Sequence, residues 1–179
     1  MRAFIAVLVC SLLAACASAP DVRAPVSVVA TTPPPVRIGL ALGGGAAKGF
    51  AHIGVIKMLE ANGIHPAVVS GTSAGSVVGA LYASGMDAYA LQQTAVALDE
   101  AKIRDVSLFS GGVVKGRKLQ DYVNAAVGNR TIEQLRKPFA AVATRLEDGS
   151  PILFTRGDTG LAVRASCSIP CVFEAAAVG

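Results

Sequence analysis

Tryptophan is absent from this chain of 179 residues, and aromatic residues make up only 5% of it. The sequence therefore offers no series of aromatic side chains on which unpaired bases could stack. Its formal net charge of +4 is too small to indicate a nucleic-acid-binding domain. We expect no nucleic-acid partner.

Histidine is also scarce, since the chain has only His52 and His65. Neither lies near a pair of cysteines, which a structural zinc site would need. Cys167 and Cys171 are close enough in sequence for a short-loop disulfide, but we expect two small, buried, free thiols. We expect no metal ion and no cofactor.

The N-terminal apolar run, residues 3–15, is shorter than the roughly 20 residues that a membrane-spanning helix needs. With Arg2 before it, the run has the layout of a secretory signal, and Cys10 would leave with it. Residues 13–16, Leu-Ala-Ala-Cys, resemble the lipobox of bacterial lipoproteins. We therefore expect residues 1–15 to be a signal peptide and Cys16 to carry lipid. An ordinary signal, cleaved after Ala-Ser-Ala at residues 17–19, is the alternative.

Ala17 follows the lipobox cysteine and, by the same resemblance, implies sorting to the outer membrane. The expected location is the bacterial cell envelope, lipid-anchored at the periplasmic face of that membrane. A multiply acylated cysteine would make the anchor stable, whereas a single chain would not. Residues 16–35 are rich in proline, so they predict a semi-rigid linker between anchor and domain.

Residues 71–75, Gly-Thr-Ser-Ala-Gly, lie between an apolar run at 66–70 and a helix-like stretch at 76–82. A strand, a sharp turn and a helix form the setting of a nucleophile elbow. Gly71 and Gly75 would permit the tight turn, and the helix N-terminus would favour a developing anion beside Ser73. The sequence thus predicts a serine hydrolase site, with an ordinary glycine-rich turn as the alternative.

A second glycine cluster, residues 43–49, also follows an apolar run and precedes a helix-like segment. An oxyanion hole needs two backbone N–H groups directed at one point. We expect one from Ala74 and the other from the loop Gly43, Gly44 and Gly45, most simply from Gly44 or Gly45. A phosphate-binding loop is the rival interpretation, but Lys48 stands where the dinucleotide pattern needs its third glycine.

The order of residues along the chain restricts the type of hydrolase. An α/β-hydrolase triad places its histidine after the nucleophile, and no histidine follows Ser73. We interpret His52 and His65 as packed or solvated side chains. A carboxylate is then the candidate base that takes the serine proton.

Three blocks together resemble the patatin-like phospholipases. Residues 43–55 resemble their oxyanion block, residues 71–75 their nucleophile block, and residues 164–170 a third block near the active site. The resemblance extends over residues 36–173. It implies a Ser–Asp dyad that hydrolyses lipid acyl esters without metal or histidine, with Ser73 as nucleophile and Gly44, Gly45 and Lys48 in the oxyanion region.

The chain departs from that family at the catalytic aspartate, which is expected in an Asp-Gly-Gly or Asp-Gly-Ala motif shortly after the third block. The only Asp-Gly here is at Asp148, between two strand-like runs, where it predicts a hairpin turn. We therefore expect a truncated chain that lacks its base. The longer parent would be a lipid acyl hydrolase, and this chain alone nearly inactive; a catalytically inactive lipid-binding fragment is the alternative.

Strand-like and helix-like patterns alternate over residues 36–179, which indicates an α/β fold with a mostly parallel sheet. The resemblance makes this a patatin-like three-layer α/β/α sandwich, incomplete at its C-terminus. We expect strands at 37–42, 67–70, 139–144 and 151–155, and helices at 48–61, 74–83, 87–101, 116–127 and 158–166, with a short one after Thr131.

Overall fold

The computed structural model describes residues 36–98 and 114–178. These residues belong to the second of two compact units, Val36–Gly179. The predicted signal peptide, Cys16 and the linker at 16–35 lie outside the described residues, so they stay predictions. Within residues 36–98 and 114–178, no helix is both long enough and apolar enough to cross a membrane.

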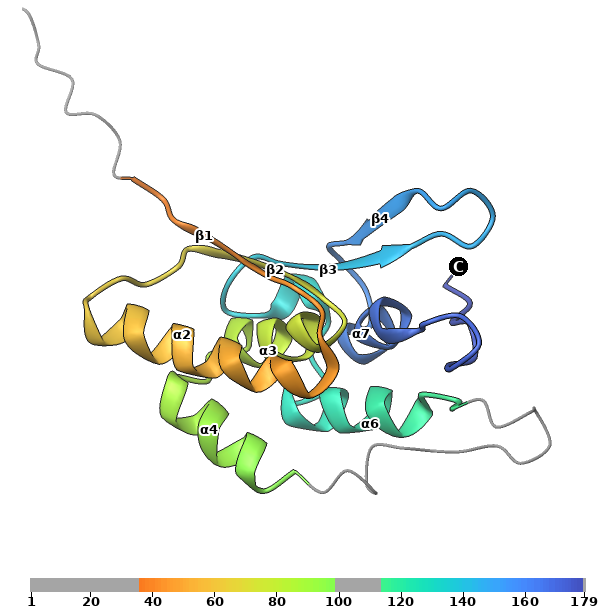
Figure 1. Ribbon diagram of the computed structural model, residues 1–179. Helices are drawn as coiled ribbons and strands as arrows, with labels where there is room; N and C mark the ends of the chain where they lie inside the picture. Colours follow the sequence, from red (N-terminus) through yellow and green to blue (C-terminus); the bar gives the residue numbers. More distant parts are fainter. Residues whose placement is uncertain (1–35, 99–113, 179) are drawn as a thin grey trace, which may run out of the picture. The chain divides into compact units, whose positions relative to one another are not determined.

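The centre of the fold is a four-stranded sheet in the order β1-β2-β3-β4 (Figure 1). Strands β1 and β2 are parallel, as are β2 and β3, whereas β4 runs antiparallel to β3. The predicted α/β fold with a mostly parallel sheet is therefore confirmed. The strands are β1 (Gly39–Leu42), β2 (Val68–Thr72), β3 (Phe139–Thr144) and β4 (Pro151–Phe154).

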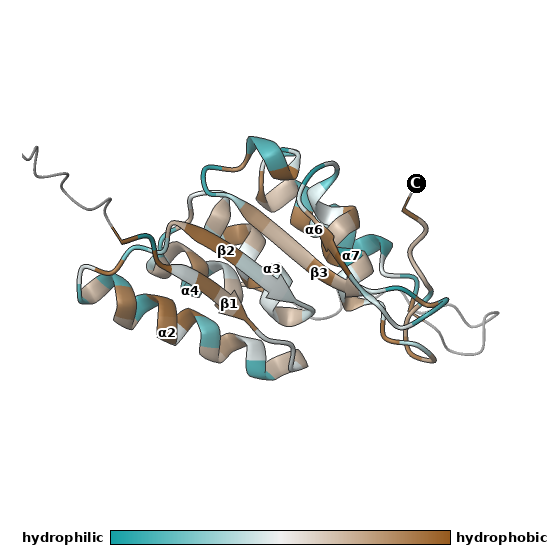
Figure 2. Cartoon of the chain, turned by 90° about the horizontal axis from the view of Figure 1, so that it is seen from above, coloured by the Kyte–Doolittle hydropathy of each residue, from teal (hydrophilic) through white to brown (hydrophobic). Residues whose placement is uncertain are grey.

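Helices connect the parallel strands and lie on one side of the sheet in Figure 1. Figure 2, which looks down on the sheet, shows α3 and α6 behind the strands and α2 beside β1. The α-helices are α2 (Phe50–Ala61), α3 (Ala74–Ala83), α4 (Ala88–Val96), α6 (Arg117–Ala126) and α7 (Thr159–Cys167), and the 3-10 helices are η2 (Ala46–Gly49) and η4 (Ile132–Gln134).

Helix α3 packs closely on the sheet because its inner face is made of small residues. A Cβ at Gly79 would lie 3.0 Å from the Phe139 ring and 3.2 Å from Val69. Both of these strand residues are buried, and burial of each such side chain stabilises the fold by about 1.5–3 kcal/mol. This contact fixes α3, and with it the turn that precedes α3, against the middle of the sheet.

The other face of the sheet is partly open within the described part of the chain. Val68 and Leu153, which point to that face, are 41% and 59% exposed. Residues 36–98 and 114–178 therefore supply the sheet and one helical layer of the expected sandwich.

Capping side chains define several helix ends where the sequence predicted them. The Asp87 carboxylate accepts a hydrogen bond from the Ala90 N–H at 2.8 Å, and Thr131 forms a capping box with Gln134. Helix α4 ends at Val96 rather than continuing toward residue 101 as predicted. Strand β2 continues to Thr72, beyond the predicted end at residue 70, because it pairs with β3 as far as Val142.

Candidate active site

Ser73 occupies the single position between strand β2 and helix α3. Its φ of 52° and ψ of −123° are unusual for a residue with a side chain. Such backbone strain costs of order 1–3 kcal/mol and is typical of a nucleophile elbow. The serine is half-buried rather than enclosed in the core. The strand, turn and helix predicted around residues 71–75 are therefore present.

The elbow fits against strand β1 only because Gly75 lacks a side chain. A Cβ at this position would collide with the backbone of Leu42 and lie 2.6 Å from the Gly43 carbonyl oxygen. Gly71 is equally confined, since its Cβ would collide with the backbone of Gly75. The close backbone approach expected of these two glycines is thus present, and it brings the end of β1 to the elbow.

The glycine loop lies directly against Ser73. A Cβ at Gly44 would be 3.4 Å from the Ser73 Cβ, and one at Gly49 would be 2.7 Å from the Ala74 Cβ. Within the described residues, the N–H groups of Gly44 and Ala74 donate to no acceptor. The structure therefore brings the two expected sources of oxyanion donors together.

Lys48 follows the loop in the 3-10 helix η2 and is exposed. Its N–H donates to the Gly45 carbonyl at 3.0 Å, and its aliphatic stem packs beside Gly45. Its contacts in the described residues thus shape the loop. They include no ion pair that would hold its ammonium group at Ser73.

Ser166, from the third sequence block, holds the elbow to the sheet. Its hydroxyl accepts a hydrogen bond from the Ser73 N–H at 2.8 Å and donates one to the Val142 carbonyl at 2.5 Å. Val142 is the β3 partner of Thr72, the last residue of β2. The Ser166 hydroxyl therefore continues the pairing of β2 and β3 at the point where the chain leaves the sheet. This role was not predicted.

Cys167 is buried next to this hydroxyl bridge. Burial raises the pKa of its thiol from the usual 9.0 to about 11, although hydrogen bonds with Ser76 and Ser73 oppose the rise. Both described cysteines are free. The predicted pair of buried free thiols is right for Cys167 and wrong for Cys171, which is exposed in the turn after α7.

Several of the described carboxylates have partners away from Ser73. The Glu60 carboxylate accepts from the Ala88 N–H at 3.0 Å, and the Asp158 carboxylate caps α7. Asp148 forms the predicted hairpin turn, where its hydrogen bonds with the side chain and backbone of Ser150 hold the pKa of its carboxyl below the usual range. In residues 36–98 and 114–178, no hydrogen bond or ion pair joins a carboxylate to Ser73.

The two histidines differ in their surroundings. His65 is exposed, so it is the solvated one of the two alternatives that were expected. His52 is neither simply packed nor solvated, because its Nε2 lies 2.8 Å from the carbonyl oxygen of Gly43. A carbonyl oxygen only accepts, so the ring donates this hydrogen bond. The described residues also contain no group of His, Cys, Asp and Glu side chains arranged to hold a metal ion.

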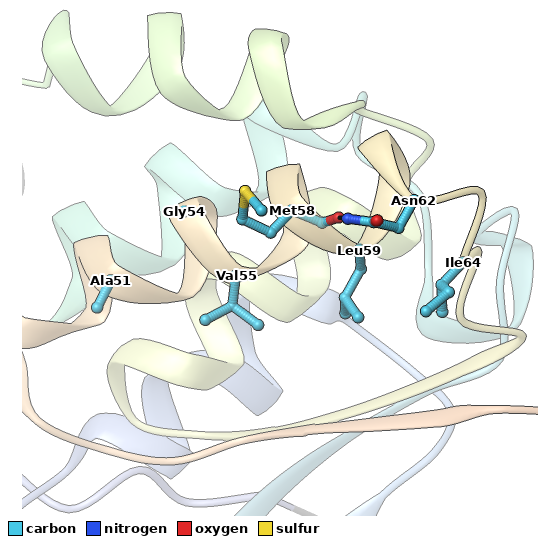
Figure 3. A pocket seen from close by; sticks show the side chains of 7 residues that line it. All are labelled: Ala51, Gly54, Val55, Met58, Leu59, Asn62 and Ile64. Carbon is cyan, nitrogen blue, oxygen red and sulfur yellow. Dashed lines mark hydrogen bonds between the residues drawn. The ribbon is translucent and has the colours of Figure 1, made fainter.

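Two open apolar hollows flank helix α2, and neither is lined by Ser73. The first, of about 420 Å³, is shown in Figure 3, where Val55 and Leu59 point to the same side of the helix. Phe50 and Val96 line the second, of about 400 Å³. These hollows place apolar surface along α2, the helix that follows the glycine loop and η2.

Comparisons with known proteins identify the family of this chain. The model of the family "Patatin-like phospholipase" matches residues 40–179. An uncharacterized NTE family protein of Mycobacterium tuberculosis (strain ATCC 25618 / H37Rv) is 40% identical over 142 residues, which are 76% of this chain and 38% of that protein. Lysophospholipase NTE1 of Coccidioides immitis (strain RS) is 36% identical over 138 residues, which are 74% of this chain and 9% of the fungal protein.

A solved structure shares the fold. The crystal structure of VipD from Legionella pneumophila superposes with a TM-score of 0.58 at 18% identity, covering 78% of this chain and 44% of that one. The chain thus spans 38% of the mycobacterial relative and less than half of VipD. Because the family model covers most of the sequence, the chain belongs to the patatin-like phospholipase family.

Proposed function

We propose that Ser73 is the nucleophile of a lipid acyl hydrolase. The observation that carries this proposal is the close approach of Gly44 to the Ser73 Cβ beside the strained elbow. Within residues 36–98 and 114–178, the N–H groups of Gly44 and Ala74 also donate to no acceptor. The family and the fungal relative's name, lysophospholipase, support a lipid ester as substrate. The substrate class is therefore carboxylic esters of fatty acids.

The reaction would proceed through an acyl-serine. As a base takes the Ser73 proton, Oγ bonds to the ester carbonyl carbon and the carbonyl oxygen becomes an oxyanion. The N–H groups of Ala74 and of Gly44 or Gly45 would stabilise this anion, with Gly43 and Lys48 shaping the loop. The alcohol then leaves with the proton, and water releases the fatty acid by the same steps.

We propose that the base is an aspartate that the 179-residue chain lacks, as the family resemblance implies. The hydrogen bonds of Glu60, Asp87, Asp148 and Asp158 support this proposal, because they direct these four carboxylates to helix caps and turns. The 179-residue chain by itself should then turn over esters slowly. The same observation favours the second candidate function, a chain that binds lipid without hydrolysing it.

Covalent labelling tests the nucleophile, and turnover tests the base. A fluorophosphonate in excess should add one mass increment to the chain, mapped to Ser73, and none to Ser73→Ala. Ser150→Ala, in the hairpin turn, is the matched control and should label like the parent. Equal labelling of Ser73→Ala would refute the nucleophile. Rapid hydrolysis of a chromogenic acyl ester by the purified chain would refute the proposed absence of the base.

We also propose that Cys16 carries lipid and tethers the protein to the cell envelope, at the periplasmic face of the outer membrane. The order of a short apolar run, two small residues and cysteine supports this. Intact mass of protein from the membrane fraction should show acyl additions that Cys16→Ser lacks. A mass without acyl groups would contradict the tether.

A further inference from the structure

The carbonyl group of Gly43 is held on two sides. The His52 ring donates a hydrogen bond to it at 2.8 Å, and a Cβ at Gly75 would lie only 2.6 Å from the same oxygen. The oxygen therefore occupies the space that a side chain at Gly75 would need. This arrangement is a contact between three parts of the site: the glycine loop, helix α2 and the first turn of α3.

The direction of this carbonyl fixes the direction of the next N–H group. In a trans peptide the C=O of one residue and the N–H of the next point to opposite sides of the chain. With the Gly43 oxygen directed at His52 and Gly75, the Gly44 N–H points away from both. That N–H donates to no acceptor in the described part of the chain, and Gly44 itself lies against Ser73.

A peptide between two glycines is otherwise easy to rotate, because neither residue has a side chain to restrict it. Rotation by half a turn would place the Gly43 carbonyl oxygen where the Gly44 N–H now lies. An oxyanion at Ser73 would then face a partial negative charge instead of a donor. Something must hold the peptide in one orientation, and the His52 hydrogen bond does so.

We propose that His52 is the positioning residue that sets the orientation of the peptide between Gly43 and Gly44, and so directs the Gly44 N–H toward the oxyanion. The inference rests on the proposed function of Ser73, but its structural part can be tested without it. The ring donates from Nε2 both as the neutral Nε2–H tautomer and as the imidazolium. Proton transfer by His52 is not part of this role, which separates it from a catalytic base.

The experiment compares His52→Leu, which removes the donor, with His52→Gln, whose amide N–H₂ can reach the same oxygen. His65→Leu makes the same chemical change at the exposed histidine and serves as the control. Two quantities are measured in the full chain: the NMR chemical shifts of the Gly43 carbonyl carbon and Gly44 amide, and the rate of Ser73 phosphonylation. Thermal unfolding of each variant shows that the fold is retained.

In His52→Leu we expect both shifts to move and the phosphonylation rate to fall by about 10- to 100-fold, since loss of one oxyanion donor costs about 100- to 1,000-fold in established cases. His52→Gln should keep the two chemical shifts near their parent values and the phosphonylation rate within about threefold of the parent. His65→Leu should match the parent in all three. Unchanged Gly43 and Gly44 shifts in His52→Leu would overturn the inference. A parent chain that stays unlabelled would instead count against Ser73 as a nucleophile in this chain, and the shifts would still decide the role of His52.

Discussion

The backbone N–H of Ser73 donates a hydrogen bond of 2.8 Å to the hydroxyl of Ser166, 93 residues further along the chain. Because that hydroxyl donates in turn to the Val142 carbonyl, one side chain replaces the ladder contact that the elbow interrupts. The Ser73 N–H is consequently occupied. This leaves the N–H of Ala74, rather than that of the serine itself, for an oxyanion.

Replacing Ser166 by alanine should therefore weaken the elbow. The Ser73 N–H and the Val142 carbonyl would lose their partner, which we expect to cost about 1–3 kcal/mol in the free energy of unfolding. Phosphonylation of Ser73 should slow as well, because the strained turn is less firmly held. Ser168→Ala is the control, since among the described residues its hydroxyl bonds only the Arg164 carbonyl. Urea unfolding in which Ser166→Ala matches Ser168→Ala would contradict this account.

Gly75→Ala should be strongly destabilising. The new methyl group would collide with the backbone of Leu42 and with the Gly43 carbonyl, and moving the end of β1 away would disrupt its pairing with β2. We expect a loss of about 3 kcal/mol or more in the free energy of unfolding. Gly54→Ala, in the interior of α2 with nothing within 4 Å of its Cβ, should instead stabilise the chain by about 0.5–1 kcal/mol. Equal melting temperatures for the two variants would rule this out.

The Cys167 thiol should make the fold sensitive to alkaline pH. Its pKa is raised from 9.0 to about 11 by burial, so the folded state disfavours the thiolate that the unfolded state forms readily. The resulting stability is fully present below pH 9 and is lost as the pH rises from about 9 through 11. Cys167→Ala should therefore lose less stability than the parent between pH 8 and pH 10. An equal loss of stability in the two proteins over this pH range would contradict the prediction.

Thiol alkylation gives a second test of the protection that burial gives to Cys167. At pH 8 iodoacetamide should modify the exposed Cys171 and leave Cys167 intact until the protein unfolds, because the thiolate is the reactive form. Peptide mass mapping distinguishes the two sites. Equal modification of both cysteines in the folded chain would show that Cys167 is not protected.

Asp148→Asn should leave the site unaffected. The carboxylate accepts from the N–H and hydroxyl of Ser150 in the turn between β3 and β4, and an asparagine oxygen can accept the same bonds. We expect Ser73 phosphonylation to change by less than about twofold. A large fall in that rate, with the fold intact by thermal unfolding, would make Asp148 a candidate base and overturn its assignment to the turn.

The local features of this fold were predictable because their causes lie close together in sequence. Asp87 caps the helix that follows it by accepting from an N–H only three residues away, and Asp148 and Gly149 form a turn within one hairpin. The elbow at Ser73 was predictable for the same reason, since its two glycines, Gly71 and Gly75, lie two residues before and two residues after the serine. Strand β2 was predicted too short because Gly71 was interpreted only as a turn residue.

The supporting contacts of the site were not predictable in this way. The bond from Ser73 to Ser166 depends on where α7 packs against β3, which no local pattern states. His52 was interpreted as a packed or solvated residue because the sequence does not show that η2 folds the chain back and brings α2 to the Gly43 carbonyl. Likewise, the exposure of Cys171 follows from the turn at the end of α7 rather than from its residue type.

The most direct test of the account is a crystal structure of the chain after reaction with a fluorophosphonate. We predict a phosphorus bonded to the Ser73 Oγ, with a phosphonyl oxygen about 2.7–3.1 Å from the N–H nitrogens of Ala74 and of Gly44 or Gly45. A phosphonate on another residue, or a phosphonyl oxygen directed away from the glycine loop, would contradict the assignment of Ser73 and its oxyanion hole.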